Sequence, residues 1–155
     1  MRLRLVLAAL AAVILISACA TVPPSQQENR VAQLIDLINS DATGIDEVVA
    51  QTNTPFLFQS ELVVRSADVE IIWQRFRDEG VRFVPSAVPN RPASPSDYMN
   101  IADRFDLKVF FSSDGYVSDD AVWVTLDSSA GPFDLLIGGS ENRLPMVLGL
   151  VGGDR

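Results

Sequence analysis

The first 18 residues constrain the chain most, because their composition sets them apart from any folded domain. Arg2 and Arg4 precede twelve consecutive apolar residues, 5–16, and the small residues Ser17 and Ala18 follow. A basic start, an apolar run of this length and small residues at its end are typical of a secretory signal peptide. The run is too short for a membrane-spanning helix, which needs about 20 apolar residues. We therefore predict that residues 1–18 are removed and take no part in the fold.

The end of this segment carries the single cysteine of the chain. Ile16-Ser17-Ala18-Cys19 resembles the lipobox of bacterial lipoproteins. The resemblance implies that the Cys19 sulfur receives a diacylglycerol, that the chain is cut before Cys19, and that the new amine is acylated. Residues 19–24 would then form a tether. The alternative is an ordinary secretory cut after Ala20, which would leave a soluble protein without cysteine.

The lipoprotein resemblance also implies an address in the cell envelope. In that family the residue after the cysteine influences sorting, and Ala20 is not the aspartate associated with retention in the inner membrane. The implied location is the outer membrane, facing the periplasm, if the cell is Gram-negative. A lone cysteine agrees with a lipid anchor, because a secreted domain that used cysteine for disulfides would need an even number.

Charge and composition exclude several classes of function. Without residues 1–18 the chain would keep 137 residues, enough for one domain, 25–155, with 10 basic and 20 acidic side chains. Nucleic acid is not an expected partner, since binding it requires a basic surface. The chain has no histidine, which excludes histidine-based triads and most zinc sites. We predict no cofactor and no metal.

Apolar periodicity predicts three helices in the first half of the domain. Ser25 to Glu28 form a capping box, and an amphipathic helix follows it. A second, short helix follows the break at 41–44, and Ser66 is expected to cap a third helix that ends at Gly80. The apolar stripes of these helices consist of Val31, Leu34, Ile35 and Ile38, then Ile45, Val48 and Val49, then Val69, Ile72, Trp73 and Phe76.

Strands are predicted mainly in the second half. A tight strand pair is expected at 56–58 and 62–64, and further strands at 107–112, 121–127, 133–138 and 144–151. The segment 85–97 contains four prolines and is predicted as a long surface loop, either a binding segment or a plain insertion. A short helix capped by Ser96 is expected over 98–105. Helices first and strands last predict an α+β domain, with helices on one side of an antiparallel sheet.

The order of elements resembles that of the NTF2-like superfamily, which includes SnoaL-type and ketosteroid-isomerase-type proteins. The resemblance covers residues 25–151. The segments that carry the resemblance are the strand pair Pro55–Val64, the helical segment Ser66–Trp73, and a meander that contains Gly131–Leu136 and Leu148–Leu150. It implies a cone in which a curved sheet wraps around helices and leaves an apolar cavity open at one end. No position matches a catalytic motif of the enzymes in this superfamily, and this chain lacks the histidine that some of them use.

Four residues are candidates to line such a cavity. Asp134 shares one strand face with Leu136, so its carboxylate could serve as a base or bind a polar ligand group; the alternative is a solvated position near the strand end. Trp73, Tyr98 and Trp123 are large and apolar with one polar group each, which suits a ligand pocket or a core.

Three functional hypotheses follow from these features. The first is an anchored, non-catalytic module that binds a small apolar ligand or an envelope protein. The second is a small enzyme of isomerase or hydratase type, with Asp134 as base and Tyr98 or Tyr116 as hydrogen-bond donor. The third is a structural accessory lipoprotein whose own aromatic side chains fill the cavity. We favour the first, because acid–base catalysis needs two positioned groups and the sequence offers one carboxylate without a partner.

Overall fold

A computed structural model of the chain describes residues 24–94, 105–111, 117, 120–138 and 143–152. The helices are α2 (Pro24–Asn39), α3 (Ile45–Ala50), α4 (Ser66–Asp78) and α6 (Phe105–Phe110). The strands are β1 (Thr52–Phe58), β2 (Glu61–Val63), β3 (Phe83–Pro85), β4 (Arg91–Pro92), β5 (Val122–Ser128), β6 (Phe133–Gly138) and β7 (Met146–Gly152). The predicted signal peptide, with Cys19, lies outside the described residues.

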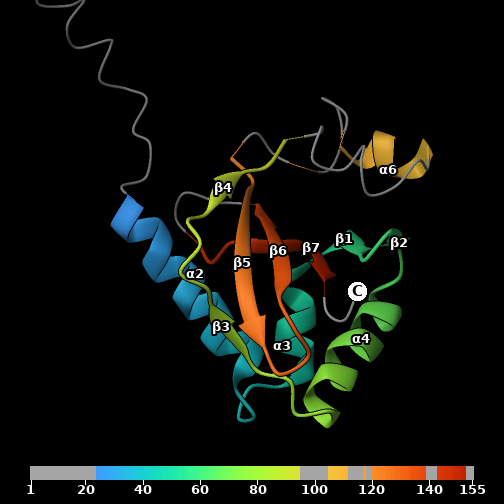
Figure 1. Cartoon of the computed structure of the whole chain (residues 1–155). Coiled ribbons are helices and arrows are strands. Elements are labelled where there is room, and N and C mark those ends of the chain that lie inside the picture. The colour runs from blue at the N-terminus through green and yellow to red at the C-terminus, as the bar shows by residue number, and fades with distance from the viewer. Residues whose placement is uncertain (1–23, 95–104, 112–116, 118–119, 139–142, 153–155) are drawn as a thin grey trace, which may run out of the picture.

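The strands form one curved sheet that does not close on itself (Figure 1). Its order is β2-β1-β7-β6-β5-β3, and β4 also pairs with β5. The neighbouring strands are antiparallel except β1 and β7, which are parallel. The predicted α+β class is confirmed. The parallel pair was not predicted, because it joins the first strand of the sheet to the last one.

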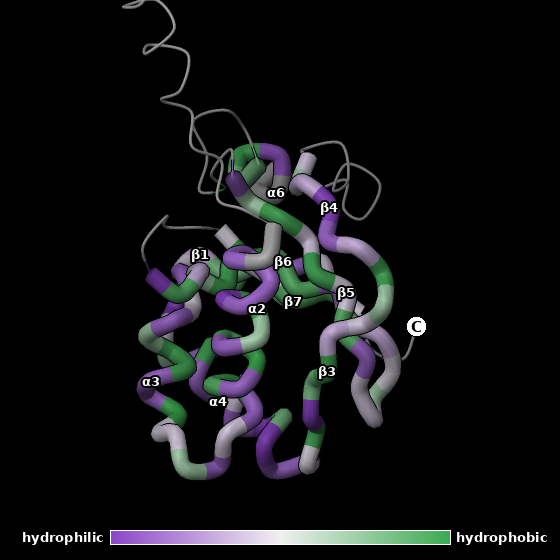
Figure 2. Tube along the Cα trace, turned by 90° about the vertical axis from the view of Figure 1, so that its left-hand side faces the viewer, coloured by the Kyte–Doolittle hydropathy of each residue, from purple (hydrophilic) through white to green (hydrophobic). Residues whose placement is uncertain are grey.

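Helices α2, α3 and α4 cover one face of the sheet, here called the inner face (Figure 2). The four stripe residues predicted for α2 are all buried, as are Val48 of α3 and both Val69 and Trp73 of α4. Ile72 and Phe76 of α4 are partly buried and pack on the same core. The predicted stripes are therefore confirmed, and they meet the inward side chains of β1, β5, β6 and β7.

The opposite, outer face of the sheet carries a second apolar core. Its buried members are Leu57, Phe110, Phe111, Ala121, Trp123, Leu136, Leu148 and Val151, here called the outer apolar cluster. These residues alternate along β1, β5 and β6 with residues of the inner core, as side chains do on opposite faces of a strand. The prediction of helices on one side only is thus incomplete, because α6 supplies Phe110 to the outer face.

Helix α6 corrects the strand predicted at 107–112. The segment Phe105–Phe110 is helical. A short apolar run does not distinguish a strand from a helix, and here the spacing of Leu107 to Phe110 and Phe111 is also that of one helix face. The predicted helix over 98–105 lies outside the described residues as far as Arg104.

The proline-rich segment also differs from its prediction as a plain loop. Arg91 and Pro92 form β4, which pairs with Trp123 and Val122 of β5, and β3 ends at Pro85. Both strands lie at the edge of the sheet, where a proline does not interrupt a ladder. Strand β3 has three residues and β4 has two, so neither shows an alternating pattern that sequence analysis could detect.

Helix boundaries lie close to the predicted ones. Helix α2 begins at Pro24, one residue before the predicted cap Ser25, and proline suits the first helical turn. Helix α4 has Arg65 at its N-cap, so Ser66 is its first residue and not its cap. The C-terminal prediction is confirmed, because Gly80 has φ of +69° and the amide of Val81 donates to the carbonyl of Phe76 at 2.9 Å.

Three amide side chains attach strands β3 and β7 to their surroundings. Asn39 at the end of α2 exchanges two hydrogen bonds with the backbone of Phe83 in β3, at 2.7 and 2.9 Å. Gln51 donates to the carbonyls of Leu144 and Pro145 just before β7. Gln59, in the turn between β1 and β2, exchanges two hydrogen bonds with the backbone of Gly152 at the end of β7.

Candidate functional site

The structure divides the predicted site residues between the two faces of the sheet. Trp73 lies in the inner core, whereas Trp123 belongs to the outer apolar cluster. Asp134 of β6 pairs with Thr125 of β5, and Thr125 lies two residues after Trp123 on β5. Asp134 therefore lies on the same sheet face as Trp123. Tyr98, Tyr116 and Cys19 lie outside the described residues. The structure therefore does not place Trp73 in one pocket with Trp123 and Asp134.

Trp73 is a packed core residue with its polar atom satisfied. Its side chain is 2% exposed, and the indole N–H donates to the Thr52 hydroxyl oxygen at 3.0 Å. Thr52 is itself buried and donates to the carbonyl of Val48 at 2.9 Å. This chain of hydrogen bonds joins α4 to β1 and α3. Burying the two polar groups together satisfies both, so neither is available to bind a ligand.

Aromatic rings continue from Trp73 along the inner face. The ring of Trp73 lies 6.1 Å from that of Phe56 and 6.0 Å from that of Phe76. Phe76, Phe83 and Phe133 form a triangle of edge-to-face contacts at 5.5 to 5.7 Å. Edge-to-face packing at these distances is favourable beyond the area it buries. Side chains thus fill the space between α4 and the sheet along this row.

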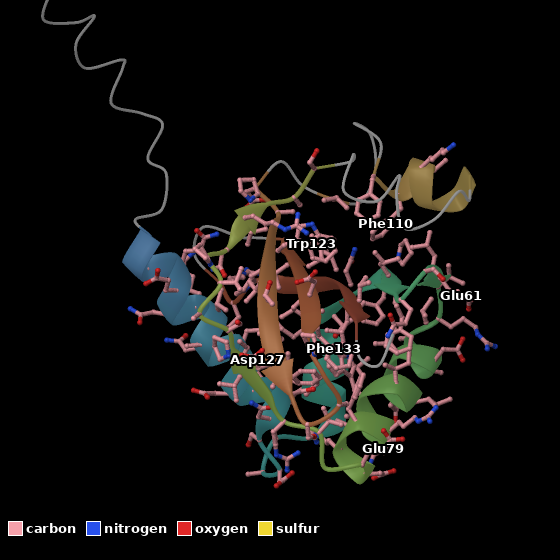
Figure 3. The ribbon with its side chains drawn as sticks, viewed as in Figure 1. Glu61, Glu79, Phe110, Trp123, Asp127 and Phe133 are labelled. Atoms are coloured by element: carbon pink, nitrogen blue, oxygen red, sulfur yellow. The ribbon has the colours of Figure 1, made fainter. Side chains whose placement is uncertain are left out.

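Trp123 is the largest side chain of the outer apolar cluster. It stands opposite Leu136 across the β5–β6 pair and is 2% exposed. The guanidinium of Arg91, on β4, lies over the indole at 5.3 Å from the ring centroid, within cation–π range. Figure 3 shows Trp123 and Phe110 at the same end of the molecule, near β4 and α6.

Phe110 and Phe111 cover the cluster from the α6 side. Phe110 is the last residue of α6 and Phe111 follows it. Their rings meet edge to face at 4.6 Å, and both are buried. The adjacent residues Lys108 and Val109 are exposed. The cover of the outer apolar cluster includes one helix of six residues, held by Phe110 at its end and by Phe111, which follows it.

Asp134 is half-buried at the edge of this cluster. Its carboxylate accepts a hydrogen bond from the hydroxyl of Thr125 at 2.9 Å, directly across the strand pair. Within the described part of the chain, no ion pair joins Asp134 to a basic group. A neutral hydroxyl can orient a carboxylate but does not form an acid–base pair with it. The contact is a cross-strand pair of the kind that stabilises sheets.

The charged groups with a displaced pKa lie on α4 and its N-cap. The hydrogen bond to Asp68, and then its charge, raises the pKa of Arg65, and Glu79 raises that of Arg75 in the same way. Both pairs are exposed on the surface. An arginine with a raised pKa stays protonated, so these pairs supply no proton transfer.

Sequence reasoning missed Leu57, Phe110 and Phe111 as members of the cluster. Strand parity could have found Leu57, which points away from its neighbours Phe56 and Phe58. The prediction of a strand at 107–112 placed Phe110 and Phe111 on opposite faces, so it did not predict that both belong to one cluster. Helical spacing would have placed them with Leu107 on one side of a short helix.

The described residues contain no group of three or more acidic or cysteine side chains placed to hold a metal ion. Among these same residues, no helix has the length and apolar character needed to cross a membrane. No family model, curated protein or solved structure matches the chain.

Proposed function

We propose that the chain is an envelope lipoprotein, anchored through lipid on Cys19, whose NTF2-like domain binds a small apolar ligand without catalysing a reaction. The proposal of the fold family is supported by the order of the elements. A helix, a short helix, a tight strand pair, a third helix and a final meander of β5, β6 and β7 follow one another as the resemblance implies. The curved, open sheet around α2, α3 and α4 agrees with a cone (Figure 1).

The observation that carries the ligand proposal is the outer apolar cluster beneath α6. Its sheet side is formed by Leu57, Trp123, Leu136 and Leu148, a surface suited to an alkyl chain or a ring. A six-residue helix is too short to be stable by itself, so its place depends on Phe110 and Phe111. Elements with so few buried contacts open more readily than the core. A ligand would take the place of the two phenylalanine rings.

The same region argues against catalysis. Asp134 is the candidate base, and its partner is the uncharged hydroxyl of Thr125. General acid–base catalysis needs a second positioned group, together with a space in which the reacting atom lies close to both. The hydrogen bonds of the described residues bring no such second group to Asp134.

Native mass spectrometry of the detergent-solubilised full chain would test ligand binding. We expect an adduct of lipid or aromatic mass on the wild type, and a larger adduct fraction with Phe110→Ala, which removes part of the cover. The matched control is Phe76→Ala, which truncates a phenylalanine on the inner face. The proposal fails if wild type and Phe110→Ala both carry no adduct, or if Phe76→Ala changes the adduct as much as Phe110→Ala does.

A structural accessory lipoprotein is the second candidate. It is favoured by the row of rings from Phe56 through Trp73 and Phe76 to Phe133, which occupies the inner face with the chain's own side chains. Absence of an adduct from every variant, together with an intact lipid on Cys19, would favour this candidate over the ligand-binding one.

A further inference from the structure

Helix α4 has a side that faces away from the core. The helix packs on α3, β1 and β2, and it forms the lower right margin of the domain in Figure 1. Val69 and Trp73 of this helix are buried in the inner core, whereas Ile71 is 65% exposed. Val64, which lies just before the helix, is 70% exposed, and these two are the most exposed large apolar side chains of the described residues. Single exposed apolar residues are normal, but the charges around Ile71 indicate what covers it.

Two ion pairs border Ile71 on this side of the helix. The carboxylate of Asp68 accepts a hydrogen bond from Arg65 at 2.7 Å, and that of Glu79 accepts one from Arg75 at 2.8 Å. Residues 68, 71 and 75 share one helix face, because they are three and four positions apart. In chain order the charges are plus, minus, plus, minus, and Ile71 lies between the inner two. We call these four charged residues, together with Ile71 and Val64, the α4 surface.

The order of these charges is complementary to its own reverse. In an antiparallel pair of α4 helices with a two-fold axis beside Ile71, Asp68 lies opposite the partner's Arg75, because they are three residues before and four residues after Ile71. Arg65 and the partner's Glu79 match similarly, at six before and eight after. The mismatches are one and two residues, at about 1.5 Å each, which an arginine side chain can span. Each of the four charges thus meets one of opposite sign.

The same charges disfavour a parallel pair. Parallel helices related by a two-fold axis would place Asp68 beside the partner's Asp68 and Arg75 beside the partner's Arg75, and like charges in contact are costly. On the other side of Ile71, the antiparallel pair places Glu70 opposite the uncharged amide of the partner's Gln74. The α4 surface is therefore complementary to itself in one orientation, as a contact between two identical chains requires.

We propose that the α4 surface is the contact between two copies of this chain, with antiparallel α4 helices and with Ile71 of each copy packed against the partner's Ile71 at the axis. A helix of 13 residues on each side makes a small contact beside the roughly 1,200–2,000 Å² of a stable interface. The dimer is therefore weak and dissociates on dilution. The outer apolar cluster lies on the opposite face of the sheet, so this contact does not depend on the proposed ligand.

Disulfide cross-linking of the purified full chain in mild detergent tests the contact. Ile71→Cys places a thiol at the axis, where the two copies meet. Val84→Cys on β3 is the matched control, since Val84 is 58% exposed and lies outside the α4 surface. Wild type reports any cross-link through Cys19. We expect a several-fold higher yield of cross-linked dimer from Ile71→Cys than from Val84→Cys, and equal yields would contradict the proposal.

Asp68→Cys and Arg75→Cys test the orientation of the two helices. In the antiparallel pair, cross-links form between the two variants when they are mixed, with a tag on one of them to mark mixed dimers by size. Each variant alone should give a several-fold lower yield. If each variant cross-links with itself and the mixture gives no mixed dimer, the helices are parallel and the proposal is wrong.

Sedimentation of the full chain in the same detergent measures association without cross-links. We expect a dimer fraction that grows with concentration, and a dissociation constant raised by about tenfold or more in Ile71→Glu, because two carboxylates would meet at the axis. Val84→Glu should leave it unchanged. In dilute solution, where the copies are separate, Ile71→Glu should unfold at the same denaturant concentration as wild type, which excludes misfolding as the cause. A wild type that stays monomeric, or equal weakening by both changes, would overturn the proposal.

Discussion

At the scale of single residues, the two tryptophans show how the fold gives one side chain type two different environments. Trp73 donates to Thr52 inside the inner core, whereas Trp123 lies on the outer face beneath the guanidinium of Arg91. From the sequence, both are large apolar side chains that suit either a ligand pocket or a core. The sequence does not state which sheet face each occupies, since that depends on the register between β5 and β6 and on the position of α4.

Truncation of Trp73 should destabilise the domain strongly. Trp73→Ala is expected to lower the free energy of unfolding by about 3 to 5 kcal/mol, because it removes a buried ring with aromatic contacts and leaves a cavity. Ile71→Ala is the control on the same helix, since Ile71 is exposed and should change stability by about 0.5 kcal/mol or less. Denaturant unfolding followed by circular dichroism measures both. A loss below about 1 kcal/mol for Trp73→Ala would contradict its place in the core.

Asp134→Asn should leave fold and ligand binding nearly unchanged. The amide oxygen can still accept the hydrogen bond from Thr125, so we expect a stability change below about 1 kcal/mol. Asp127→Asn, at an exposed position of β5, is the control. Unfolding and the native-mass adduct measure the two properties. If a substrate is found whose turnover falls by about 10² to 10⁴ in Asp134→Asn, the carboxylate is a base and the non-catalytic proposal is wrong.

At the scale of elements, the sheet depends on contacts that join its first hairpin to its last strand. Strand β7 lies parallel to β1, and the Gln59 side chain is bonded to Gly152 at the end of β7. The backbone N–H of Gln59 also donates to the carbonyl of Leu150 at 2.9 Å. Gly149 provides room for this pairing, because a Cβ there would lie 2.9 Å from the Cβ of Leu57. These contacts span about 90 residues of sequence, so no local pattern predicts them.

Gln59→Ala should therefore loosen the end of β7. The change removes two hydrogen bonds to the Gly152 backbone, and at about 0.5 to 1.5 kcal/mol for each we expect a loss of about 1 to 3 kcal/mol. Gln74→Ala is the matched control, since the Gln74 side chain donates to the exposed Asp78 within the same helix, α4. Chemical denaturation gives the stabilities, and amide hydrogen exchange at residues 150–152 reports the strand end. Equal effects of the two changes would show that Gln59 does not hold β7.

The elements differ in how well the sequence predicts them. Helices α2, α3 and α4 and strands β5 and β6 have enough turns or alternating residues to show their period, and their predicted positions hold within one or two residues. Strands β3 and β4 are too short to show one. For α6, the run from Leu107 to Phe111 fits both periods, and only the apolar sheet face beneath it selects the helix.

At the scale of the whole molecule, the sequence predicts the class of fold better than the location of a site. Apolar stripes on helices must meet a sheet, which is enough to predict an α+β domain. Which residues meet on the outer face depends on β1 lying beside β7 and on α6 bringing Phe110 into the outer apolar cluster. The composition of the chain predicts neither of these two arrangements. Trp73 and Trp123 lie in separate apolar clusters on opposite faces of the sheet, an arrangement that depends on these contacts.

The proposed anchor on Cys19 would decide the place of the molecule in the cell, and Cys19→Ser tests this proposal directly. If lipid on Cys19 holds the protein, the variant should appear in the soluble fraction or remain as an uncut precursor, because the sulfur that accepts the diacylglycerol is gone. A lipoprotein carries several acyl chains, and one chain alone gives only marginal binding, so loss of the cysteine should abolish stable attachment. Ala20→Asp is the matched control, which should stay lipidated and move to the inner-membrane fraction, as the lipoprotein resemblance implies. Intact mass and membrane fractionation of wild type and both variants measure this. An unmodified wild-type N-terminus at Thr21 would establish the ordinary secretory cut in place of the anchor.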